Sequence, residues 1–287
     1  MKRTFLCCVG LTITAIAAAQ ATSALMKAVV VHEFGGPEVM KYEDVPRPDP
    51  KEDEILVRVM AAAVNPVDSY VRQGMLAKHG MDKRPAIIGY DISGVVEKTG
   101  ANAKKFKAGD KVYSYLSVMR GGGYAEFAVA KESETALKPK NINFEEAAAV
   151  PLAATTAWQS LVDEAKLNAG QTVLVHGGSG GVGSFAIQIA KALARSYGVV
   201  KKGGIIVSIT DEPDQTECAK HGISGSRLGA HPDAKVLEEL TKLIEAGKMK
   251  PIVSQTLPLA DASKAHQQIE THHTLGKIVL KVADTPK

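Results

Sequence analysis

Residues 171–195 read QTVLVHGGSGGVGSFAIQIAKALAR, and this stretch decides the expected fold. The short apolar run 172–175 is typical of a strand that is buried on both faces of a sheet. A glycine-rich turn follows the run, and apolar residues then recur at helical spacing. A strand, a glycine turn and a helix in this order form the first half of a dinucleotide-binding unit.

The turn contains the pattern G-x-G-x-x-G, formed by Gly178, Gly180 and Gly183. Without Cβ atoms the chain can turn tightly, and its N–H groups can approach a pyrophosphate beside the positive end of the following helix. A glycine-rich turn that binds nothing is the alternative, and the flanking strand and helix favour nucleotide binding. The predicted cofactor-binding residues of this turn are Gly178, Ser179, Gly180, Gly181, Val182 and Gly183.

The composition is that of an ordinary globular protein of one or two domains. The chain has 287 residues, which is enough for a sizeable core. Its 35 basic and 31 acidic residues are interspersed, so nucleic acid is not an expected partner. Of the three cysteines, Cys7 and Cys8 lie near the N-terminus. Cys218 alone can form neither an internal disulfide nor a multi-cysteine zinc site.

Residues 1–25 have the outline of a secretory signal peptide. A basic start is followed by an apolar stretch at 6–19 and by small residues suited to cleavage. The apolar stretch is short for a membrane span, so we expect no stable span in the mature form. The alternative is that translation starts at Met26. The expected location is therefore secreted or periplasmic if the signal is used, and cytoplasmic if it is not.

The remaining pattern divides the chain into a β-rich part and an α/β part. Prolines between residues 46 and 50 predict an extended linker within the β-rich part. Helices are expected from about residue 145 to 165, split at Pro151, and again after a cap at Asp261 as far as about Thr271. The predicted strands outside the glycine unit are 27–34, 54–63, 88–98, 111–115, 124–129, 252–257 and 277–282.

From Met26 onward the chain resembles the medium-chain dehydrogenase/reductase superfamily, in its zinc-independent quinone oxidoreductase branch, which is zeta-crystallin-like. The resemblance covers nearly the whole mature chain, and the motifs occur in the family's order. They are AAAVNPVDSYVRQG (61–74), PAIIGYDISGVVEKTG (85–100), FKAGDKVY (106–113), GGYAEF (122–127), AAAVPLAATTAW (147–158), VHGGSGGVG (175–183) and GKIVLKV (276–282).

The resemblance implies a fold of the α/β class with two domains. A GroES-like β-rich catalytic domain would span residues 26–150 and be completed by residues 250–287. A Rossmann-like nucleotide-binding domain would span residues 151–249. Family members commonly pair as dimers, so a homodimer is possible.

Two departures from the zinc-dependent members indicate that no metal is bound. Those members have a cysteine ligand where this chain has Asn65 and Pro66, and a His-Glu pair where it has Tyr90 and Asp91. Zinc favours thiolate and imidazole ligands, and neither is supplied. The substrate must therefore hold the incoming electron pair itself, as quinones and α,β-unsaturated carbonyls do by conjugation.

The resemblance also places Asn65 and Tyr70 in the cleft near the nicotinamide and the substrate, as catalytic candidates. Tyr70 would donate a hydrogen bond to a substrate or cofactor oxygen, and Asn65 would help to orient either one. The alternatives are local: Asn65 fixes the turn before Pro66, and Tyr70 packs in the first helix. Asp68 and Arg72 are four residues apart and are expected to form an ion pair on the helix surface.

Further cofactor contacts are expected from three hydroxyl side chains. Thr155 can face the nicotinamide, although capping of a helix N-terminus is the simpler explanation for it and for Thr156. Ser208 and Thr210 follow the apolar segment after the glycine unit and are also candidates. NADP is the cofactor expected from the family, and NAD stays open.

The nucleotide-binding unit is interrupted after about residue 195. A second strand and a ribose-recognising side chain should follow the helix. Instead the segment YGVVKKGGIIVSI at 197–209 follows, which in the family belongs near the end of the Rossmann domain. The truncation is expected to leave the first strand with an exposed edge and the adenosine side of the site largely absent.

Two functions therefore remain open. The first is an NADP-dependent oxidoreductase that transfers a hydride to a quinone or an α,β-unsaturated carbonyl, a small-molecule substrate, without zinc. The second is a catalytically impaired or inactive remnant of the family that acts as a binding or structural protein.

Overall fold

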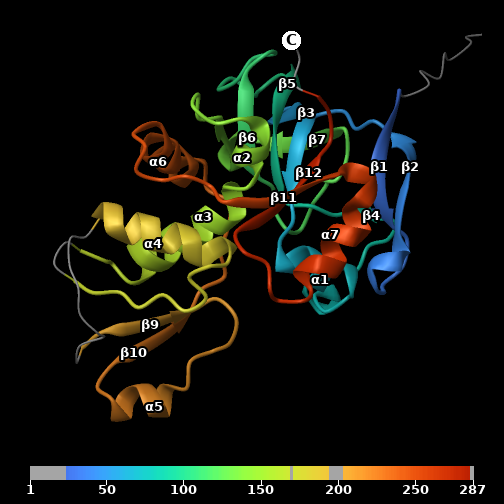
Figure 1. Ribbon diagram of the computed structural model, residues 1–287. Coiled ribbons are helices and arrows are strands. Elements are labelled where there is room, and N and C mark those ends of the chain that lie inside the picture. Colours follow the sequence, from blue (N-terminus) through green and yellow to red (C-terminus); the bar gives the residue numbers. More distant parts are fainter. Residues whose placement is uncertain (1–23, 169–170, 194–202, 285–287) are drawn as a thin grey trace, which may run out of the picture.

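A computed structural model describes residues 24–168, 171–193 and 203–284 (Figure 1). The predicted signal peptide lies almost entirely outside these residues. Within the described ranges, no helix combines the length and the apolar character that crossing a membrane requires.

A seven-stranded sheet forms the centre of the molecule, with β3 at its middle. β3 pairs antiparallel with β5, β7 and β12, and nine of its ten residues are buried. The predicted strands 54–63 and 111–115 are confirmed as β3 and β6. The strands of this sheet are β3 (Glu54–Ala63), β5 (Asp91–Thr99), β6 (Lys111–Tyr115), β7 (Phe127–Lys131), β8 (Thr135–Leu137), β11 (Val253–Pro258) and β12 (Lys277–Lys281).

A smaller sheet contains β1 (Leu25–Val31), β2 (Met40–Pro46) and β4 (Ala86–Ile87), with β1 in the middle. β2 was not predicted, because its residues are mostly exposed and polar and carry little apolar signal. It is an edge strand that ends at Pro46, which is where a proline can be accommodated.

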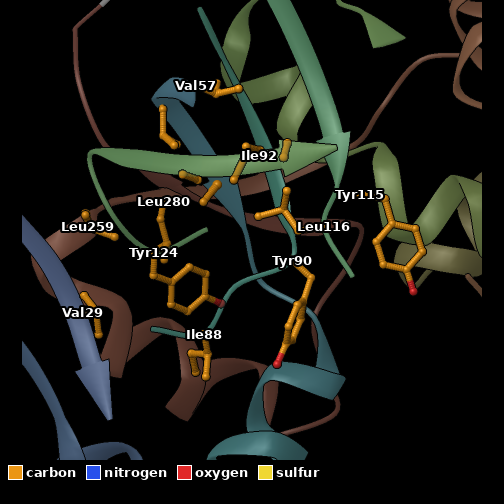
Figure 2. Close-up of a cluster of buried hydrophobic side chains, with 14 of the residues drawn as sticks. Val29, Val57, Ile88, Tyr90, Ile92, Tyr115, Leu116, Tyr124, Leu259 and Leu280 are labelled. Atoms are coloured by element: carbon orange, nitrogen blue, oxygen red, sulfur yellow. The ribbon is translucent and has the colours of Figure 1, made fainter. Parts of the chain in front are cut away.

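The main core lies between these two sheets (Figure 2). Val57 of β3, Ile92 of β5 and Leu280 of β12 are fully buried in it, together with Tyr124 and Val29. Residues from both ends of the chain therefore share one core, and the C-terminal strand β12 is fixed beside β3.

Seven α-helices are present in the described ranges. α2 and α3 are separated at Pro151 as predicted, and α3 continues as a π-helix at Gln159–Glu164. α7 begins after Asp261, whose carboxylate pairs with Lys264 instead of capping the backbone. The helices are α1 (Pro66–Arg72), α2 (Phe144–Ala148), α3 (Pro151–Trp158), α4 (Gly181–Leu193), α5 (Gln215–Lys220), α6 (Ala234–Glu245) and α7 (Ala262–Ile269).

The helix that follows the glycine turn, α4, packs on other helices. Phe185 and Ile189 are fully buried in a cluster with Leu237 of α6 and with residues of α3. Tyr113 of β6 donates a hydrogen bond from its hydroxyl to the Leu237 carbonyl at 2.6 Å. These contacts pack α4 against other helices, and the Tyr113 hydrogen bond joins α6 to the central sheet.

The predicted buried strand at 172–175 is wrong, because this segment forms no strand. Val173 and Leu174 are exposed, Leu174 by 61%. The next strands, β9 (Ile205–Ser208) and β10 (Ser224–Arg227), pair in parallel with each other in a separate two-stranded sheet. In a doubly wound sheet of order 3-2-1-4-5-6, the first strand lies between the second and the fourth. Within the described residues neither partner lies beside the apolar run, so the run forms no strand instead of the exposed-edge strand that was expected.

Candidate cofactor and substrate site

The glycine turn has the geometry that its sequence pattern predicts. Gly177 adopts a left-handed φ of +64°, and its carbonyl accepts the N–H of Gly180 at 3.0 Å. A Cβ on Gly183 would lie 2.2 Å from the Gly177 carbonyl oxygen, so only glycine lets α4 approach the turn this closely. The first N–H groups of a helix have no intrahelical partner and can bind an anion.

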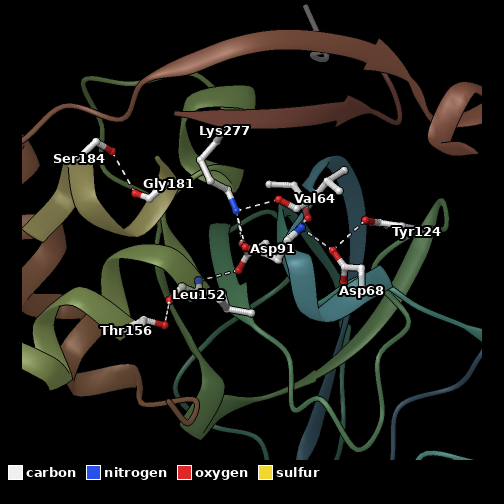
Figure 3. Close-up of polar contacts among 11 residues, drawn as sticks. Val64, Asp68, Asp91, Tyr124, Leu152, Thr156, Gly181, Ser184 and Lys277 are labelled. Carbon is white, nitrogen blue, oxygen red and sulfur yellow. Dashed lines mark hydrogen bonds and ion pairs between the residues drawn. The ribbon is translucent and has the colours of Figure 1, made fainter. Parts of the chain in front are cut away.

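The turn is held against the start of β12. The Gly276 N–H donates to the Ser179 carbonyl at 2.8 Å, and Gly180 and Gly276 form a parallel bridge. A Cβ on Gly181 would lie 2.9 Å from Cδ of Lys277. The Lys277 side chain therefore packs directly beside the turn. Figure 3 draws Gly181 and Lys277 in one view.

Lys277 connects the glycine turn to the catalytic candidate Asn65. Its ammonium is buried and donates to the Val64 carbonyl at 3.0 Å and to Oδ1 of Asn65, and it pairs with Asp91 at 3.5 Å (Figure 3). The Asn65 amide also donates to Asp91 at 2.9 Å, and Asp91 accepts the Leu152 N–H at 2.7 Å. Asn65 is thus fixed at both ends of its amide.

Burial shifts the pKa values of the two charged groups in this cluster. It lowers the pKa of Lys277 and raises the pKa of Asp91, while the opposite charge of each partner favours ionisation. Lys277 was not predicted as a site residue, because Lys277 and Asp91 meet only in the folded chain. The segment GKIVLKV that contains Lys277 carries the family resemblance but no pattern that indicates a site.

Asp68 was expected on the surface of α1 in an ion pair with Arg72, and this prediction is wrong. Both side chains are fully buried. Asp68 accepts the Asn65 N–H at 2.6 Å and the Tyr124 hydroxyl at 3.0 Å, whereas Arg72 pairs with Glu270. The four-residue spacing does place them on one helix face, but that face packs against the core.

A chain of hydrogen bonds continues from Asp68 into the core. Arg72 donates from Nε to Nδ1 of His266 at 3.2 Å, so the His266 proton lies on Nε2 and faces the Tyr124 hydroxyl at 3.3 Å. Burial and the nearby Arg72 lower the pKa of His266 to about 3, which keeps the ring neutral. Burial, aided by the charge of Asp91, raises the pKa of Asp68 to about 7. Oδ1 of Asp68 has no hydrogen-bond partner within the described residues.

Replacing Asp68 with asparagine should change how stability depends on pH. The folded chain holds the Asp68 proton up to about pH 7, whereas an unfolded aspartate ionises near pH 3.9. The folded state therefore binds more protons in this window, and the contribution of Asp68 to stability falls as pH rises. Between pH 5 and pH 8, the unfolding free energy of wild type should drop by roughly 3 kcal/mol relative to Asp68→Asn.

Urea denaturation of both proteins at the two pH values measures this difference. Asp49→Asn is a matched control, because Asp49 is a highly exposed carboxylate, and its difference from wild type should barely change with pH. A difference for Asp68→Asn that stays constant, or that grows in the opposite direction, would contradict the raised pKa.

The other predicted site residues occupy different surroundings. Thr155 is fully buried within α3, and its hydroxyl has no partner in the part of the chain that the structure describes. Thr156 donates to the Leu152 carbonyl at 2.7 Å. The predicted role in helix capping is wrong for both threonines, because α3 begins at Pro151 and Val150 occupies its N-cap. Tyr70 lies on α1 with 37% of its surface exposed, so it is not packed in the core.

Ser208 and Thr210 lie at the end of β9. The Ser208 hydroxyl accepts the N–H groups of Thr210 at 3.4 Å and Asp211 at 3.2 Å, and Arg227 donates to the Thr210 carbonyl at 2.9 Å. These contacts are all local to the two-stranded sheet. The described contacts do not bring Ser208 or Thr210 to the glycine turn, so their role in cofactor binding stays a prediction.

The residues present fit the inner half of a dinucleotide. A Cβ built on Gly180 meets only the Gly177 carbonyl oxygen, at 3.4 Å, which leaves open space over the turn for a diphosphate. The buried Thr155 hydroxyl still needs a partner, because buried polar groups are nearly always hydrogen-bonded. A nicotinamide carboxamide is a chemically suitable partner.

Residues 51–140 match the family described as alcohol dehydrogenase GroES-like domain, and residues 182–280 match the family described as zinc-binding dehydrogenase. Over 315 residues, covering 89% of this chain and 79% of the relative, the chain is 34% identical to the NADPH-dependent alkenal/one oxidoreductase of Arabidopsis thaliana. Because that alignment is longer than the 287-residue chain, the relative has residues that this chain lacks.

A second relative is the quinone oxidoreductase of Homo sapiens, 43% identical over 58% of this chain. The chain spans about half the length of that relative, 50%. Among solved structures, the quinone oxidoreductase from Coxiella burnetii superposes with a TM-score of 0.80 at 27% identity, over 91% of this chain and 100% of that one. The chain belongs to the medium-chain dehydrogenase/reductase superfamily, in its quinone oxidoreductase branch.

Proposed function

We propose that this chain is an NADPH-dependent oxidoreductase that reduces a quinone or an α,β-unsaturated carbonyl. The observation that carries the proposal is the direct contact between the glycine turn and Lys277, whose ammonium holds Asn65. A diphosphate on the turn and a substrate beside Asn65 would therefore lie within the span of one cofactor. The relatives named as alkenal/one and quinone oxidoreductases support this substrate class.

The protein's part in the reaction is to bind and to position. A bound nicotinamide supplies the hydride, and conjugation in the substrate accommodates the electron pair. The first N–H groups of α4 would bind the diphosphate. Lys277 and Asp91 hold the Asn65 amide in one orientation. The exposed Tyr70 is the candidate to donate a hydrogen bond to a substrate oxygen.

We propose further that no zinc takes part. The places that bear the cysteine ligand and the His-Glu pair in zinc-dependent relatives hold Asn65-Pro66 and Tyr90-Asp91. The side-chain oxygens of Asn65 and Asp91 both contact the Lys277 ammonium, so a positive charge already occupies this position. A zinc ion brought to this position would meet an amide and a paired carboxylate, which are poor replacements for thiolate and imidazole.

Oxidation of NADPH by the purified chain tests the proposed function. With a 2-alkenal or a 1,4-quinone, loss of absorbance at 340 nm should exceed that of a Gly183→Asp variant, in which the turn cannot close and carries a negative charge. Addition of a zinc chelator should leave the rate unchanged. Turnover no greater than that of Gly183→Asp, with both classes of substrate, would reject the proposal.

A further inference from the structure

Asn65 is held by its main chain as well as by its amide. Its N–H donates to Oδ2 of Asp68 at 2.6 Å, and its carbonyl accepts the Asp68 N–H at 3.0 Å. Both residues are buried, and Asn65 is the N-cap of α1. The amide contacts with Lys277 and Asp91 set the direction of the side chain, whereas the contacts with Asp68 set the main chain from which the side chain projects.

Asp68 is held in turn by groups from distant segments. The Tyr124 hydroxyl donates to the same Oδ2 at 3.0 Å (Figure 3). Nε2 of His266, on α7, faces that hydroxyl at 3.3 Å, and the two rings meet edge to face with their centroids 5.9 Å apart. All three side chains are fully buried. The Asp68 carboxylate therefore has little freedom to turn away from the Asn65 N–H.

The strength of the hold on Asn65 depends on the charge of Asp68. A carboxylate accepts a hydrogen bond more strongly than a neutral carboxyl does, because the acceptor is ionised. The Asn65 N–H is therefore held most firmly when Asp68 has lost its proton. Burial opposes this ionisation and raises the pKa of Asp68 to about 7, whereas the two donors on Oδ2 favour it, so both forms are populated near neutral pH.

Among the titratable groups around Asp68, the tyrosines and the histidine are neutral near pH 7. Burial raises the pKa of each tyrosine and lowers the pKa of His266 to about 3. Asp91 and Lys277 lie beside each other, and each favours the charged form of the other. Arg72, on the same helix as Asp68, pairs with Glu270. The groups that face Asp68 or its Tyr124 partner from other elements are Tyr90, Asp91, Tyr115, Tyr124, His266 and Lys277.

We propose that Asp68 is a positioning residue for the reduction, which fixes Asn65 beside the cofactor through its main chain and is itself fixed by Tyr124. The inference rests on the proposed function, since it takes Asn65 as a group beside the nicotinamide and the substrate. Asp68 is fully buried and acts through Asn65. A weaker hold on Asn65 lowers the turnover number, while NADPH still binds through its diphosphate at the start of α4.

Turnover of the full chain with NADPH and a 2-alkenal, measured from pH 6 to pH 8.5, tests the inference. Asp68→Asn retains an oxygen for the Asn65 N–H but is neutral at every pH, so it imitates the protonated carboxyl. At pH 8 its kcat should be about tenfold lower than that of wild type, and the ratio should fall towards one as the pH decreases to 6. The Kd of NADPH should stay within about twofold of the wild-type value.

Tyr124→Phe removes one donor from Oδ2 of Asp68 and keeps the aromatic ring. Because the hydroxyl favours the ionised carboxylate, its loss should raise the pKa of Asp68. The midpoint of the rise in kcat should then move by about one unit to higher pH. A merely structural role for the hydroxyl would lower stability without moving this midpoint. Asp49→Asn, which changes a highly exposed carboxylate, should keep the wild-type kcat at every pH.

Three results would overturn the inference while wild type still reduces the alkenal, so that the proposed function stands. The first is an Asp68→Asn variant with the wild-type kcat at pH 8, or with the wild-type pH dependence, which would assign the titration to Asp91 and Lys277. The second is a midpoint in Tyr124→Phe that stays in place or moves to lower pH. The third is a loss of NADPH affinity in Asp68→Asn as large as the loss of kcat, which would indicate general damage to the fold. If wild type neither binds NADPH nor reduces the alkenal, the proposed function itself fails, and the inference fails with it.

Discussion

Replacing Lys277 with methionine should destabilise the chain by about 3–5 kcal/mol. Methionine keeps an unbranched stem of similar length but removes the ammonium. Asp91, which is fully buried, would then lose the cation that favours its charged form, and the Asn65 amide and the Leu152 N–H would remain as its partners. Leaving one member of a buried ion pair without its partner is much more costly than removing an exposed pair.

Urea denaturation at pH 7 measures the effect, with two matched variants. Lys281→Met makes the same change on the same strand, β12, where the lysine is exposed and pairs with Asp284, so the loss should be much smaller than for Lys277→Met. Adding Asp91→Asn to Lys277→Met neutralises the unpaired carboxylate and keeps an acceptor for the Leu152 N–H. The double variant should recover most of the lost stability.

A stability of Lys277→Met within about 1 kcal/mol of wild type would show that Asp91 is not charged in the fold. A double variant no more stable than Lys277→Met alone would show that the lysine stabilises the chain by packing rather than by its charge. Either result would remove the electrostatic explanation for how Asn65 is held.

The parts of the fold that the sequence predicted correctly are those in which one segment carries its own signal. β3 is a largely apolar run and β6 is a short run rich in Val and Tyr, both between turn residues, and most of their residues are buried. The glycine turn was recognisable because the left-handed φ of Gly177 and the close approach at Gly183 both arise within a few residues. Local sequence was sufficient in each case.

The errors occur where the outcome depends on distant segments. The run 172–175 has the residues of a buried strand, but a strand also needs neighbours to pair with, and these have to come from elsewhere in the chain. Asp68 and Arg72 were correctly placed on one face of α1. That this face is buried depends on Tyr124 and on α7, nearly 200 residues later in the sequence.

The candidate site, like these parts of the fold, depends on contacts between distant segments that local sequence does not reveal. Lys277 and Asp91 are 186 residues apart, and neither the spacing nor the composition around them indicates that they meet. The sequence placed Asn65 near the cofactor through its family motif, whereas the reason for its orientation, an amide held between an ammonium and a carboxylate, is visible only in the structure.

Gly183→Ala should abolish measurable NADPH binding, with a loss of at least about 100-fold in affinity. The added methyl group would lie 2.2 Å from the Gly177 carbonyl oxygen and 2.7 Å from Cα of Gly178. Both are backbone atoms, so relief requires the turn to open and α4 to move away from it. The same clash should lower the unfolding free energy by about 1–3 kcal/mol.

Gly180→Ala is the matched change within the same turn. Its methyl group would meet only the Gly177 carbonyl oxygen, at 3.4 Å, and its φ lies outside the left-handed region. The free chain should therefore keep its stability within about 0.5 kcal/mol. If a diphosphate occupies the open space over the turn, the methyl group intrudes on it, and NADPH affinity should fall at least about tenfold.

The two alanine variants together distinguish the effect of the turn's shape on stability from the role of the turn in cofactor binding. Denaturation and NADPH titration should both respond at Gly183, whereas at Gly180 only the titration should respond. If the turn is purely structural, NADPH should bind neither to wild type nor to either variant. Gly183→Ala would still be less stable than wild type. If Gly180→Ala bound NADPH as tightly as wild type does, the diphosphate would have to lie elsewhere, and the N–H groups at the start of α4 would not be its binding site.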